Sequence, residues 1–318
     1  MPDLPLVSII TPSYNQDQFL EATIRSVLEQ DYARIEYIII DGDSKDNSRA
    51  IIERYADRLA YWESLSDRGQ AHAINKGLQR AHGDILGWLN SDDILLPGVV
   101  SRIVEDFGQF PDVDVIYGRL ERIDEHGTIL PTPTLPKDRV DFGLDQVLSE
   151  CVVNQPGSFW RRSAMEKVGW LDEKLRYSLD YDYWIRMALA GARFRHLPIP
   201  VAQFRLSRAS KTVGQTAAFA QEQLGVLETL FGRPDLPSRL GWTAKEVRRQ
   251  MLRTRASIRL NVCYGQLKLH RYNMAARWLV KALRDDPFVV FQRRWLDLAI
   301  ARLAARRTRG LQNKFQEN

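Results

Sequence analysis

The sequence predicts an α/β protein with a mostly parallel central sheet, followed by a region built from helices alone. Three observations support this. Apolar strand patterns alternate with amphipathic helix patterns over residues 1–118. One of these strands, Ile85–Leu89, runs directly into the acidic pair Asp92 and Asp93. From Ala217 onward, apolar residues recur only at the spacing of a helix.

Length and composition favour a soluble globular protein with one large domain and an appended region. The 318 residues suffice for one large domain and a smaller part, and a hydrophobic fraction of 44% is ordinary. No run of about 18 apolar residues occurs, and the first residues do not resemble a signal peptide. Cys151 and Cys263 are the two cysteines, which argues against a disulfide scaffold. We therefore expect a cytoplasmic protein.

Charge is distributed unevenly along the chain. The net charge is +5, but residues 241–318 carry 18 Lys and Arg against 5 Asp and Glu, a local charge of +13. The remaining 240 residues carry 27 against 35, or −8. This asymmetry predicts that the two parts of the chain have different partners. The basic part is expected to bind an anionic partner.

Four strand patterns each end in a polar loop before the next helix. The strands are expected at residues 7–10, 35–40, 59–65 and 85–89, and the loops at residues 11–15, 41–44, 66–70 and 90–93. Alternating strands and helices imply parallel pairing with right-handed crossovers. The four loops should then converge at the carboxyl edge of the sheet, where α/β proteins bind ligands.

The acidic pair allows two interpretations. Two adjacent carboxylates repel each other and are costly to desolvate, so a divalent cation is one reason to find them together. Alternatively, Asp92 or Asp93 caps a helix that begins near Pro97. From the residues alone the two interpretations carry about equal weight.

The loops offer the groups that a nucleotide diphosphate needs. They carry an aromatic ring, hydrogen-bond acceptors, a cation and the acidic pair. A Gly-x-Gly-x-x-Gly motif does not follow the first strand, and a Gly-Lys-Ser/Thr loop is missing. These absences argue against a dinucleotide dehydrogenase and against a P-loop phosphotransferase.

Four motifs in order resemble glycosyltransferase family 2. They are Thr11-Pro12-Ser13-Tyr14-Asn15, Asp41-Gly42-Asp43-Ser44, the stretch Gly69–Gly77, and Asn90-Ser91-Asp92-Asp93. The resemblance covers roughly residues 5–215. It implies an A-type glycosyltransferase fold with a Rossmann-like, mostly parallel sheet, a nucleotide-sugar donor and inversion at the anomeric carbon.

The resemblance also implies roles for individual residues. At the base and ribose it places Thr11, Pro12, Tyr14 and Asp41, with Asp43 and Arg68 as further contacts. In its metal motif the first acid, Asp92, faces the ribose and the second, Asp93, binds Mg²⁺ or Mn²⁺. Without the resemblance, core packing for Tyr14 and a solvated surface position for Arg68 are the simpler interpretations.

An acceptor half is expected over residues 119–215. Residues 119–129 predict a β-ribbon that turns at Glu125-His126-Gly127, and residues 131–136 predict a proline-rich loop. The resemblance places the catalytic base at Asp180, with Asp182 as its rival, although Leu179 stands where many members have a glutamate. Helix capping by Asp180 is the alternative, and a helix N-terminus would also favour its ionised form.

A departure from the family pattern occurs at Ser207. Many similar sequences have a histidine at this position that assists the metal or the diphosphate. We expect any such role to shift to Arg205, Arg208 or Lys211.

The C-terminal region, residues 216–318, is expected to be helical. Residues 272–287 match half of a tetratricopeptide repeat, but one partial match is weak, so a helical hairpin is the simpler interpretation. The last helix combines an apolar stripe with six arginines between residues 293 and 309. An anionic membrane, nucleic acid or an acidic protein could explain this charge. We favour the membrane, at its inner face, and expect no nucleic-acid partner.

Taken together, the sequence predicts a metal-dependent, inverting glycosyltransferase. Its donor is a UDP- or dTDP-sugar of the hexosyl or N-acetylhexosaminyl type, and its acceptor is a saccharide or a lipid-linked saccharide in cell-surface polysaccharide synthesis. The catalytic domain spans residues 1–215, with the nucleotide-sugar half at about 1–118. The alternatives are a sugar-phosphate nucleotidyltransferase, whose glycine-rich basic loop is missing, and a non-catalytic nucleotide-sugar-binding module.

Overall fold

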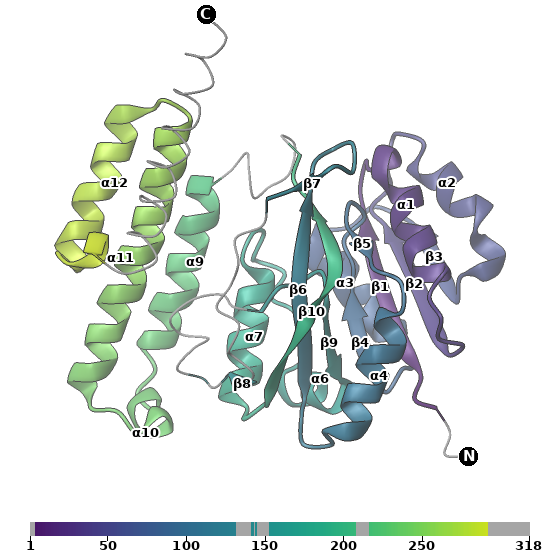
Figure 1. Ribbon diagram of the computed structural model, residues 1–318, viewed down its shortest axis with the longest axis horizontal. Coiled ribbons are helices and arrows are strands. Elements are labelled where there is room, and N and C mark those ends of the chain that lie inside the picture. Colours follow the sequence, from purple (N-terminus) through teal and green to yellow (C-terminus); the bar gives the residue numbers. More distant parts are fainter. Residues whose placement is uncertain (1–3, 132–140, 143, 145–152, 208–215, 292–318) are drawn as a thin grey trace, which may run out of the picture. The chain divides into compact units, whose positions relative to one another are not determined.

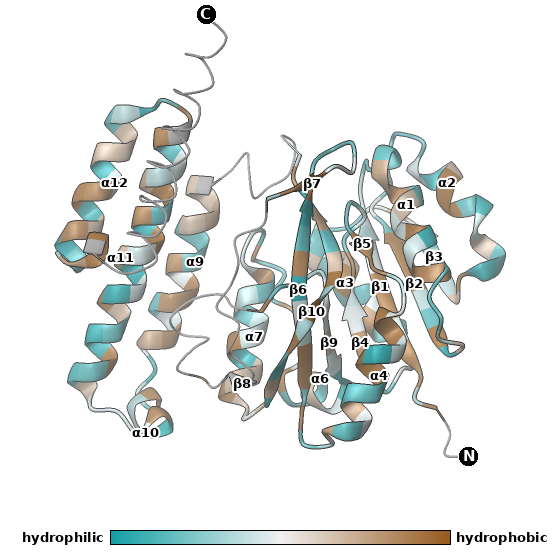
Figure 2. Ribbon diagram, in the orientation of Figure 1, coloured by the Kyte–Doolittle hydropathy of each residue, from teal (hydrophilic) through white to brown (hydrophobic). Residues whose placement is uncertain are grey.

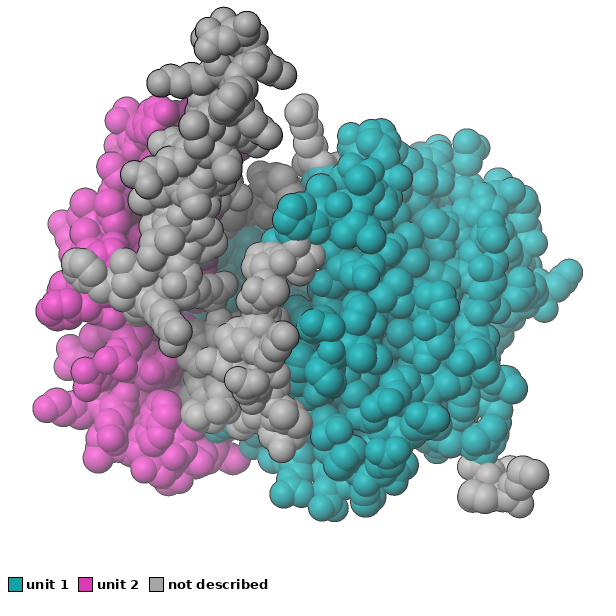
Figure 3. Space-filling model, in the orientation of Figure 1, with its two compact units in different colours: residues 1–230 teal, residues 231–318 magenta. Residues whose placement is uncertain are grey.

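A computed structural model describes residues 4–131, 141–142, 144, 153–207 and 216–291. In this part of the chain, ten strands form one sheet with helices packed against it, and further helices follow toward the C-terminus (Figure 1). The chain divides into two compact units, residues 1–230 and residues 231–318 (Figure 3). The predicted α/β fold with helices after it is confirmed.

The N-terminal half of the sheet is parallel throughout. In spatial order its strands are β3 (Tyr61–Ser64), β2 (Ile35–Asp41), β1 (Val7–Ser13) and β4 (Ile85–Trp88). The connecting helices are α1 (Asp17–Leu28), α2 (Ser48–Arg54), the short η1 (Ala56–Arg58) and α3 (Gln70–Arg80). All four strands overlap their predicted ranges, because each contains an apolar run between polar loops, although their ends differ by up to three residues.

Successive side chains of the central strand β1 point to opposite faces of the sheet. Val7 and Ile9 belong to a buried cluster with α1 residues such as Ile24. On the other face α3 packs so closely that a Cβ on Gly77 would lie 2.5 Å from Ile10. Figure 2 shows hydrophobic and hydrophilic residues sharing the helices, as in α1. Burial of both faces explains why the strands are apolar without alternation.

The second half of the sheet is mixed. Strand β9 (Ser158–Arg161) lies antiparallel between β4 and β6 (Val115–Ile123). Strand β6 is parallel to β10 (Phe194–Arg205), which also pairs with β5 (Ile94–Leu95) and β8 (Asp141–Phe142) in antiparallel fashion. Helices α4 (Val99–Gln109), α6 (Arg162–Val168) and α7 (Leu179–Leu189) belong to this half. The predicted ribbon is confirmed, since β6 turns at residues 124–127 into β7 (Ile129–Leu130).

The helical part of the chain contains the predicted hairpin. Helix α9 (Thr216–Phe231) lies almost entirely in the first unit. The two units therefore meet after residue 230, whereas the sequence places the end of the catalytic domain at residue 215. In the second unit, α10 (Leu236–Leu240) precedes the hairpin of α11 (Ala244–Lys268) and α12 (Tyr272–Asp285), and η2 (Val289–Phe291) follows. A capping box between Thr243 and Glu246 starts α11.

Several expectations fall outside the described residues. They concern Cys151, most of the proline-rich loop, Arg208, Lys211 and the basic helix after residue 292. Among the helices that are described, none has the length and apolar content required to cross a membrane.

Candidate functional site

The sheet brings the predicted nucleotide-binding loops to one edge. Strands β1, β2 and β3 end level with one another, since Ser13 pairs with Asp41 and Asp41 with Ser64. Strand β4 lies on the other side of β1, with Trp88 level with Ile10. The loops that follow these four strands therefore meet at the carboxyl edge, as the sequence predicts.

The two neighbouring acids have different environments. Asp93 is fully buried, and its Oδ1 accepts a hydrogen bond from the backbone N–H of Arg205 at 3.1 Å. Its own carbonyl accepts from the Thr23 hydroxyl of α1 at 2.7 Å. Asp92 is half-buried. Neither acid caps a helix, because β5 follows them and α4 begins only at Val99, behind Gly98.

Burial sets the electrostatics of this pair. Desolvation and the neighbouring Asp92 charge raise the pKa of Asp93 well above its usual range, although the bonds from Arg205 and Asn90 oppose the shift. A buried carboxylate in this position needs a proton or a nearby cation. Asp92 precedes the fully buried Asp93 in the chain and is itself only half-buried. Of the two carboxylates, that of Asp92 is therefore the one that a cation could reach.

The donor set fits a hard divalent cation that is shared with a substrate. Carboxylate oxygens suit Mg²⁺ and Mn²⁺. Within the described ranges, no group of three or more His, Cys, Asp or Glu side chains could hold a metal ion by itself. Mg²⁺ sites that use one or two carboxylates take their remaining ligands from water and substrate phosphates. The acidic pair is suited to that kind of site.

A chain of amide side chains holds the acidic loop, and the sequence reasoning missed it. Gln70 of α3 donates to Asn90 Oδ1 at 2.8 Å, and Asn90 donates to Gln155 Oε1 at 2.8 Å and to Asp93 Oδ2 at 3.3 Å. Gln155 in turn donates to the Trp88 carbonyl at 2.8 Å. Gln70 and Asn90 both lie within quoted motifs, but the link through Gln155 joins segments 65 residues apart, which no local pattern indicates.

Asp41 and Asp43, which are separated by Gly42, differ in exposure. Asp41 is fully buried and accepts three hydrogen bonds, from the Ser44 N–H at 2.9 Å, the Ser44 hydroxyl at 2.5 Å and the Ser64 hydroxyl at 2.7 Å. Asp43 has a positive φ of 66° and pairs with Lys45 at 2.6 Å on the surface. Asp41 therefore braces the loops after β2 and β3, whatever else it binds.

The first motif is part strand and part loop. The predicted strand end at Ile10 is wrong, because β1 continues to Ser13 and buries Thr11 and Pro12. Thr11 Oγ1 lies 3.0 Å from the Tyr37 hydroxyl of β2, within the sheet. Tyr14 is 61% exposed, so the packing interpretation of its ring does not hold. The ring is available to stack on a ligand at the edge.

Arg68 is anchored to the acceptor half. Its guanidinium donates to Glu173 Oε2 at 2.6 and 3.0 Å, and Glu173 also accepts from Asn75 of α3 at 3.3 Å. The Arg68 side chain is 68% exposed. It lies at the surface, as the simpler interpretation holds, but in an ion pair that bridges residues 105 positions apart.

Asp180 lies in the first turn of α7, and its rival has a structural partner. Asp182 accepts from Arg186 Nε at 2.8 Å, one turn along the helix. Asp180 Oδ1 accepts from the Tyr181 N–H at 2.8 Å. Desolvation and the Glu222 charge raise the pKa of Asp180 to about 6, so burial outweighs the helix terminus that we expected to favour ionisation.

Glu222 is a second residue that the sequence reasoning missed. It comes from α9, and its carboxylate accepts the backbone N–H groups of Arg176, Tyr177 and Ser178 at 2.9, 2.7 and 2.7 Å. These three amides directly precede α7. Glu222 thereby holds the segment that leads into Asp180.

An aromatic cluster fixes α7 against the sheet. Trp184 of α7 stacks on Trp88 of β4 with 5.9 Å between ring centroids and an angle of 5°, and Trp160 of β9 meets Trp184 edge-on at 5.6 Å. Because Asp180 precedes Trp184 by one helical turn, this packing sets where the Asp180 carboxylate can lie. A Trp residue in this helix is part of the predicted motif, but its partners are not.

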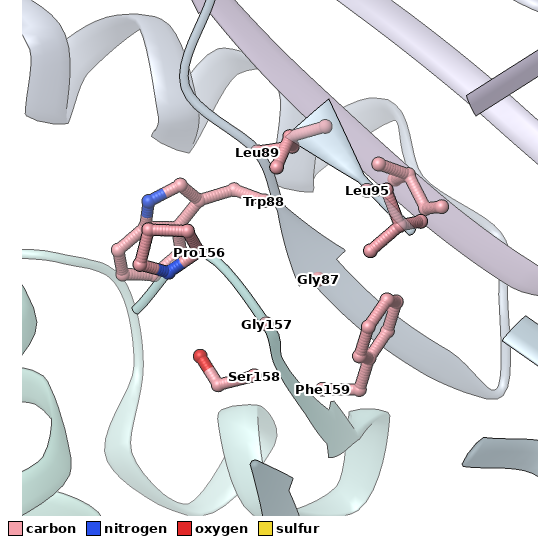
Figure 4. Close-up of a pocket in the computed structure, with 9 residues that line it drawn as sticks. Gly87, Trp88, Leu89, Leu95, Pro156, Gly157, Ser158 and Phe159 are labelled. Carbon is pink, nitrogen blue, oxygen red and sulfur yellow. The ribbon is translucent and has the colours of Figure 1, made fainter. Parts of the chain in front are cut away.

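The small cavity beside this cluster is a packing void. It is lined mainly by apolar groups of β1, β4, β5 and the chain entering β9, and Figure 4 shows Phe159 and Leu95 facing it. A Cβ on Gly87 would lie 2.8 Å from the Phe159 ring, so glycine is required there. At about 10 Å³ the cavity holds one water at most and cannot take a nucleotide.

Arg205 serves the loops around the acidic pair. The side chain is buried, donates from Nε to the Asp92 carbonyl at 3.0 Å and from Nη1 to the Asp124 carbonyl at 3.0 Å, and lies over the Phe19 ring. Its guanidinium is thus engaged with backbone groups and an aromatic face. The geometry assigns it to holding the acidic loop against the β6–β7 turn.

The sequence is similar to proteins of known family. The family model "Glycosyl transferase family 2" matches residues 8–169. A glycosyltransferase of Rickettsia prowazekii is 30% identical over 236 residues, covering 71% of this chain and 70% of that protein. One of Mycobacterium tuberculosis is 34% identical over 196 residues, covering 59% and 71%. The chain spans 62% of the Rickettsia typhi relative and 36% of the Rickettsia felis relative.

Solved structures share the fold. S. aureus TarS 1–349 in complex with UDP-GlcNAc superposes with a TM-score of 0.65 at 15% identity, over 90% of this chain and 81% of that one. The mannosyltransferase PcManGT of Pyrobaculum calidifontis, in complex with GDP-Man and Mn²⁺, gives 0.59 at 18% identity, over 92% and 83%. With the family model covering residues 8–169, the chain belongs to glycosyltransferase family 2.

Proposed function

We propose that this protein transfers a sugar from a UDP- or dTDP-sugar to a saccharide or lipid-linked acceptor, with inversion at the anomeric carbon. The transferred group would be a hexosyl or N-acetylhexosaminyl residue, and the product would serve cell-surface polysaccharide synthesis. The observation that carries the proposal is the carboxyl edge of the sheet. There an exposed aromatic ring, Tyr14, and a half-buried acid, Asp92, follow adjacent parallel strands.

Similarity to other proteins supports the donor class. TarS binds UDP-GlcNAc, and PcManGT binds GDP-Man with Mn²⁺. Both have the fold of this chain and carry a sugar nucleotide. A nucleotide diphosphate-sugar is therefore the donor class we propose for this chain.

A divalent cation, Mn²⁺ or Mg²⁺, is proposed at the acidic pair. Because Asp93 is buried, we place the direct contact on Asp92 and give Asp93 the role of fixing the loop behind it. A bound cation would neutralise the charge that develops on the departing diphosphate. The chain itself fixes the acidic loop, because Asn90 donates to Asp93 and to Gln155, and Arg205 Nε donates to the Asp92 carbonyl.

Asp180 is proposed as the general base. It would accept the proton of the acceptor hydroxyl as that oxygen attacks the anomeric carbon and the bond to the diphosphate breaks. A pKa of about 6 suits this role, because the carboxylate is ionised at neutral pH yet remains basic enough to take a proton. Asp182 is less suited, since Arg186 already occupies its carboxylate.

Membrane association is proposed through the basic C-terminal part. Residues 241–318 carry a net charge of +13. Lys and Arg residues near an anionic leaflet contribute about 1 kcal/mol each. Attraction of this kind would bring the enzyme to lipid-linked acceptors at the inner face of a membrane.

The test is incubation of the protein with a panel of nucleotide-sugars and Mn²⁺, followed by measurement of the released nucleotide. Release of UDP or dTDP that increases with a saccharide acceptor supports the proposal. Release of pyrophosphate instead would indicate nucleotidyl transfer. Tight binding of the nucleotide-sugar with no product, across donors and acceptors, would indicate a binding module.

A further inference from the structure

Arg68 and Glu173 join the donor half of the chain to the acceptor half. The Arg68 guanidinium donates from Nη2 and Nε to one Glu173 oxygen, Oε2, at 2.6 and 3.0 Å. The other Glu173 oxygen accepts from Asn75 Nδ2 of α3 at 3.3 Å. Burial alone would raise the pKa of the Glu173 carboxyl, but the bonds from Arg68 and Asn75 hold that pKa below its usual range. Glu173 is therefore a carboxylate at neutral pH, and Arg68 is the cation paired with it.

Glu173 is held in place independently of Arg68. Asn75 is buried, and it accepts from the Leu171 N–H at 2.9 Å and donates to the Leu171 carbonyl at 3.0 Å. These bonds fix the chain two residues before Glu173 against α3, and the Asn75 contact to Oε1 orients the carboxylate. The Glu173 side chain is 31% exposed, against 68% for that of Arg68. Of the two partners, Arg68 is therefore the one that can turn to another anion.

Arg68 lies close to the acidic loop. It belongs to the segment that joins β3 to α3, two residues before Gln70, whose amide donates to Asn90 Oδ1 at 2.8 Å. Asn90 in turn precedes Asp92 by two residues. The Arg68 backbone is anchored, because its N–H donates to His72 Nδ1 at 3.2 Å, so only the side chain has to turn. A diphosphate that shares a cation with Asp92 would thus bring its negative charge near Arg68.

The same donors of Arg68 would bind either anion. An arginine guanidinium presents a planar set of N–H groups that fits carboxylates and phosphates alike. The two groups that reach Glu173, Nε and Nη2, belong to one edge of the guanidinium, and a phosphate bound through two parallel hydrogen bonds uses such an edge. An ion pair between partly exposed groups is weak, so giving it up costs little. A diphosphate carries more charge than one carboxylate and is therefore a strong competitor.

We propose that Glu173 and the diphosphate of the donor compete for Arg68, so that the guanidinium moves to the diphosphate when the donor binds and returns to Glu173 when the product nucleotide leaves. This inference rests on the proposed function and deepens it, because it gives a residue of the acceptor half a role in donor binding. Glu173 is a positioning residue, since it acts through Arg68. It limits how tightly the nucleotide is held and thereby favours release of UDP after transfer.

The experiment measures the affinities of UDP and of uridine, which lacks the diphosphate, by calorimetry at constant Mn²⁺. The proteins compared are the wild type, Glu173→Gln, Arg68→Gln and the double variant. Glu173→Gln keeps an oxygen for Asn75 but presents an NH₂ group, which cannot accept, to Arg68. Glu53→Gln is the matched control, because Glu53 forms an exposed ion pair with Arg49 on α2 at 2.8 Å and its substitution changes the net charge equally.

Glu173→Gln is expected to bind UDP about two- to fivefold more tightly than the wild type, because a competing ion pair of ordinary strength lowers the apparent affinity by that factor. Arg68→Gln should bind UDP about tenfold more weakly, the loss of one hydrogen bond between charged groups. Adding Glu173→Gln to it should change nothing further. Uridine should bind all the proteins equally, and Glu53→Gln should match the wild type.

Two results would overturn the inference while leaving the donor assignment intact. If Glu173→Gln binds UDP as the wild type does, or more weakly, Glu173 only tethers the acceptor half to α3. If Glu173→Gln tightens UDP equally in the Arg68→Gln background, the effect does not pass through Arg68. A wild type that binds no nucleotide diphosphate would instead refute the donor assignment, and the competition for Arg68 with it.

Discussion

Substitution of Glu222 tests how α7, the helix that carries the proposed base, is held in place. Its carboxylate accepts three backbone N–H groups at 2.7–2.9 Å, immediately before α7. Glu222→Gln keeps the shape but replaces one oxygen by an NH₂ group. That group cannot accept, so it would face the Arg176 N–H as a second donor. The substitution loses at least one hydrogen bond to a charged acceptor and weakens the other two.

The magnitude follows from these contacts. A hydrogen bond to a charged group contributes about 1.5–3 kcal/mol, and an unpaired donor adds its own cost. We expect Glu222→Gln to lower the free energy of local opening at residues 176–178 by about 2 kcal/mol. Since about 1.4 kcal/mol corresponds to a factor of ten, the amides there should exchange with solvent about 30-fold faster.

Hydrogen exchange of the full chain, followed by mass spectrometry, measures the exchange rate of the amides at residues 176–178. Glu228→Gln is the matched control, because Glu228 lies on the same helix but is exposed and makes no hydrogen bond to the described residues. Removing the Glu222 charge should also lower the pKa of Asp180, which that charge helps to raise. The acidic limb of the pH–rate profile should then move to lower pH. Equal exchange in both variants, with an unmoved profile, would refute the reasoning.

Four further outcomes are expected. Turnover should increase as pH rises through about 6, where Asp180 ionises. Asp180→Asn should lower turnover by about 10² to 10⁴-fold, whereas Asp182→Asn should not. A fully active Asp180→Asn enzyme would place the base elsewhere. Because the folded state binds the Asp180 proton more tightly than the unfolded state, the contribution of this group to stability should fall between about pH 4 and pH 6. In calorimetry, Asp92→Asn should abolish the Mn²⁺ dependence of UDP binding, whereas Asp93→Asn should retain it. The opposite pattern would assign the metal contact to Asp93. The full chain should co-sediment with anionic vesicles in a salt-sensitive way, and equal binding to neutral vesicles would exclude the electrostatic account.

The parallel half of the sheet was predictable because its signals are local. Strands such as Ile35–Asp41 are apolar runs bounded by polar loops, and each is followed by a helix of matching periodicity. Strand β9 pairs antiparallel with β4 and β6, which are distant from it in sequence, and no local pattern specifies that pairing. The end of β1 was misplaced for a related reason. Thr11 and Pro12 have polar or turn character, but pairing with β2 keeps them in the strand.

For the site, motif residues were predictable but their environments were not. The sequence indicates an acid at positions 41, 92, 93 and 180, yet it does not reveal which carboxylates are buried. Burial separates Asp93 from Asp92 and Asp41 from Asp43, and it depends on side chains that come from other strands. Glu222 lies outside every motif, on a helix whose sequence periodicity indicates only that it packs.

The acidic loop connects the donor side of the sheet to the acceptor side. Asn90 accepts from Gln70 of α3, on the nucleotide side, and donates to Gln155, which leads into β9 on the other side. Gln155 also donates to the carbonyl of Trp88, the residue on which Trp184 of α7 stacks. A shift of α7 would therefore reach Asn90 through three contacts, and Asn90 donates to Asp93. Because these contacts are continuous, the helix of the proposed base and the acidic loop of the proposed metal site are held by the same packed residues, as a reaction between two bound substrates requires.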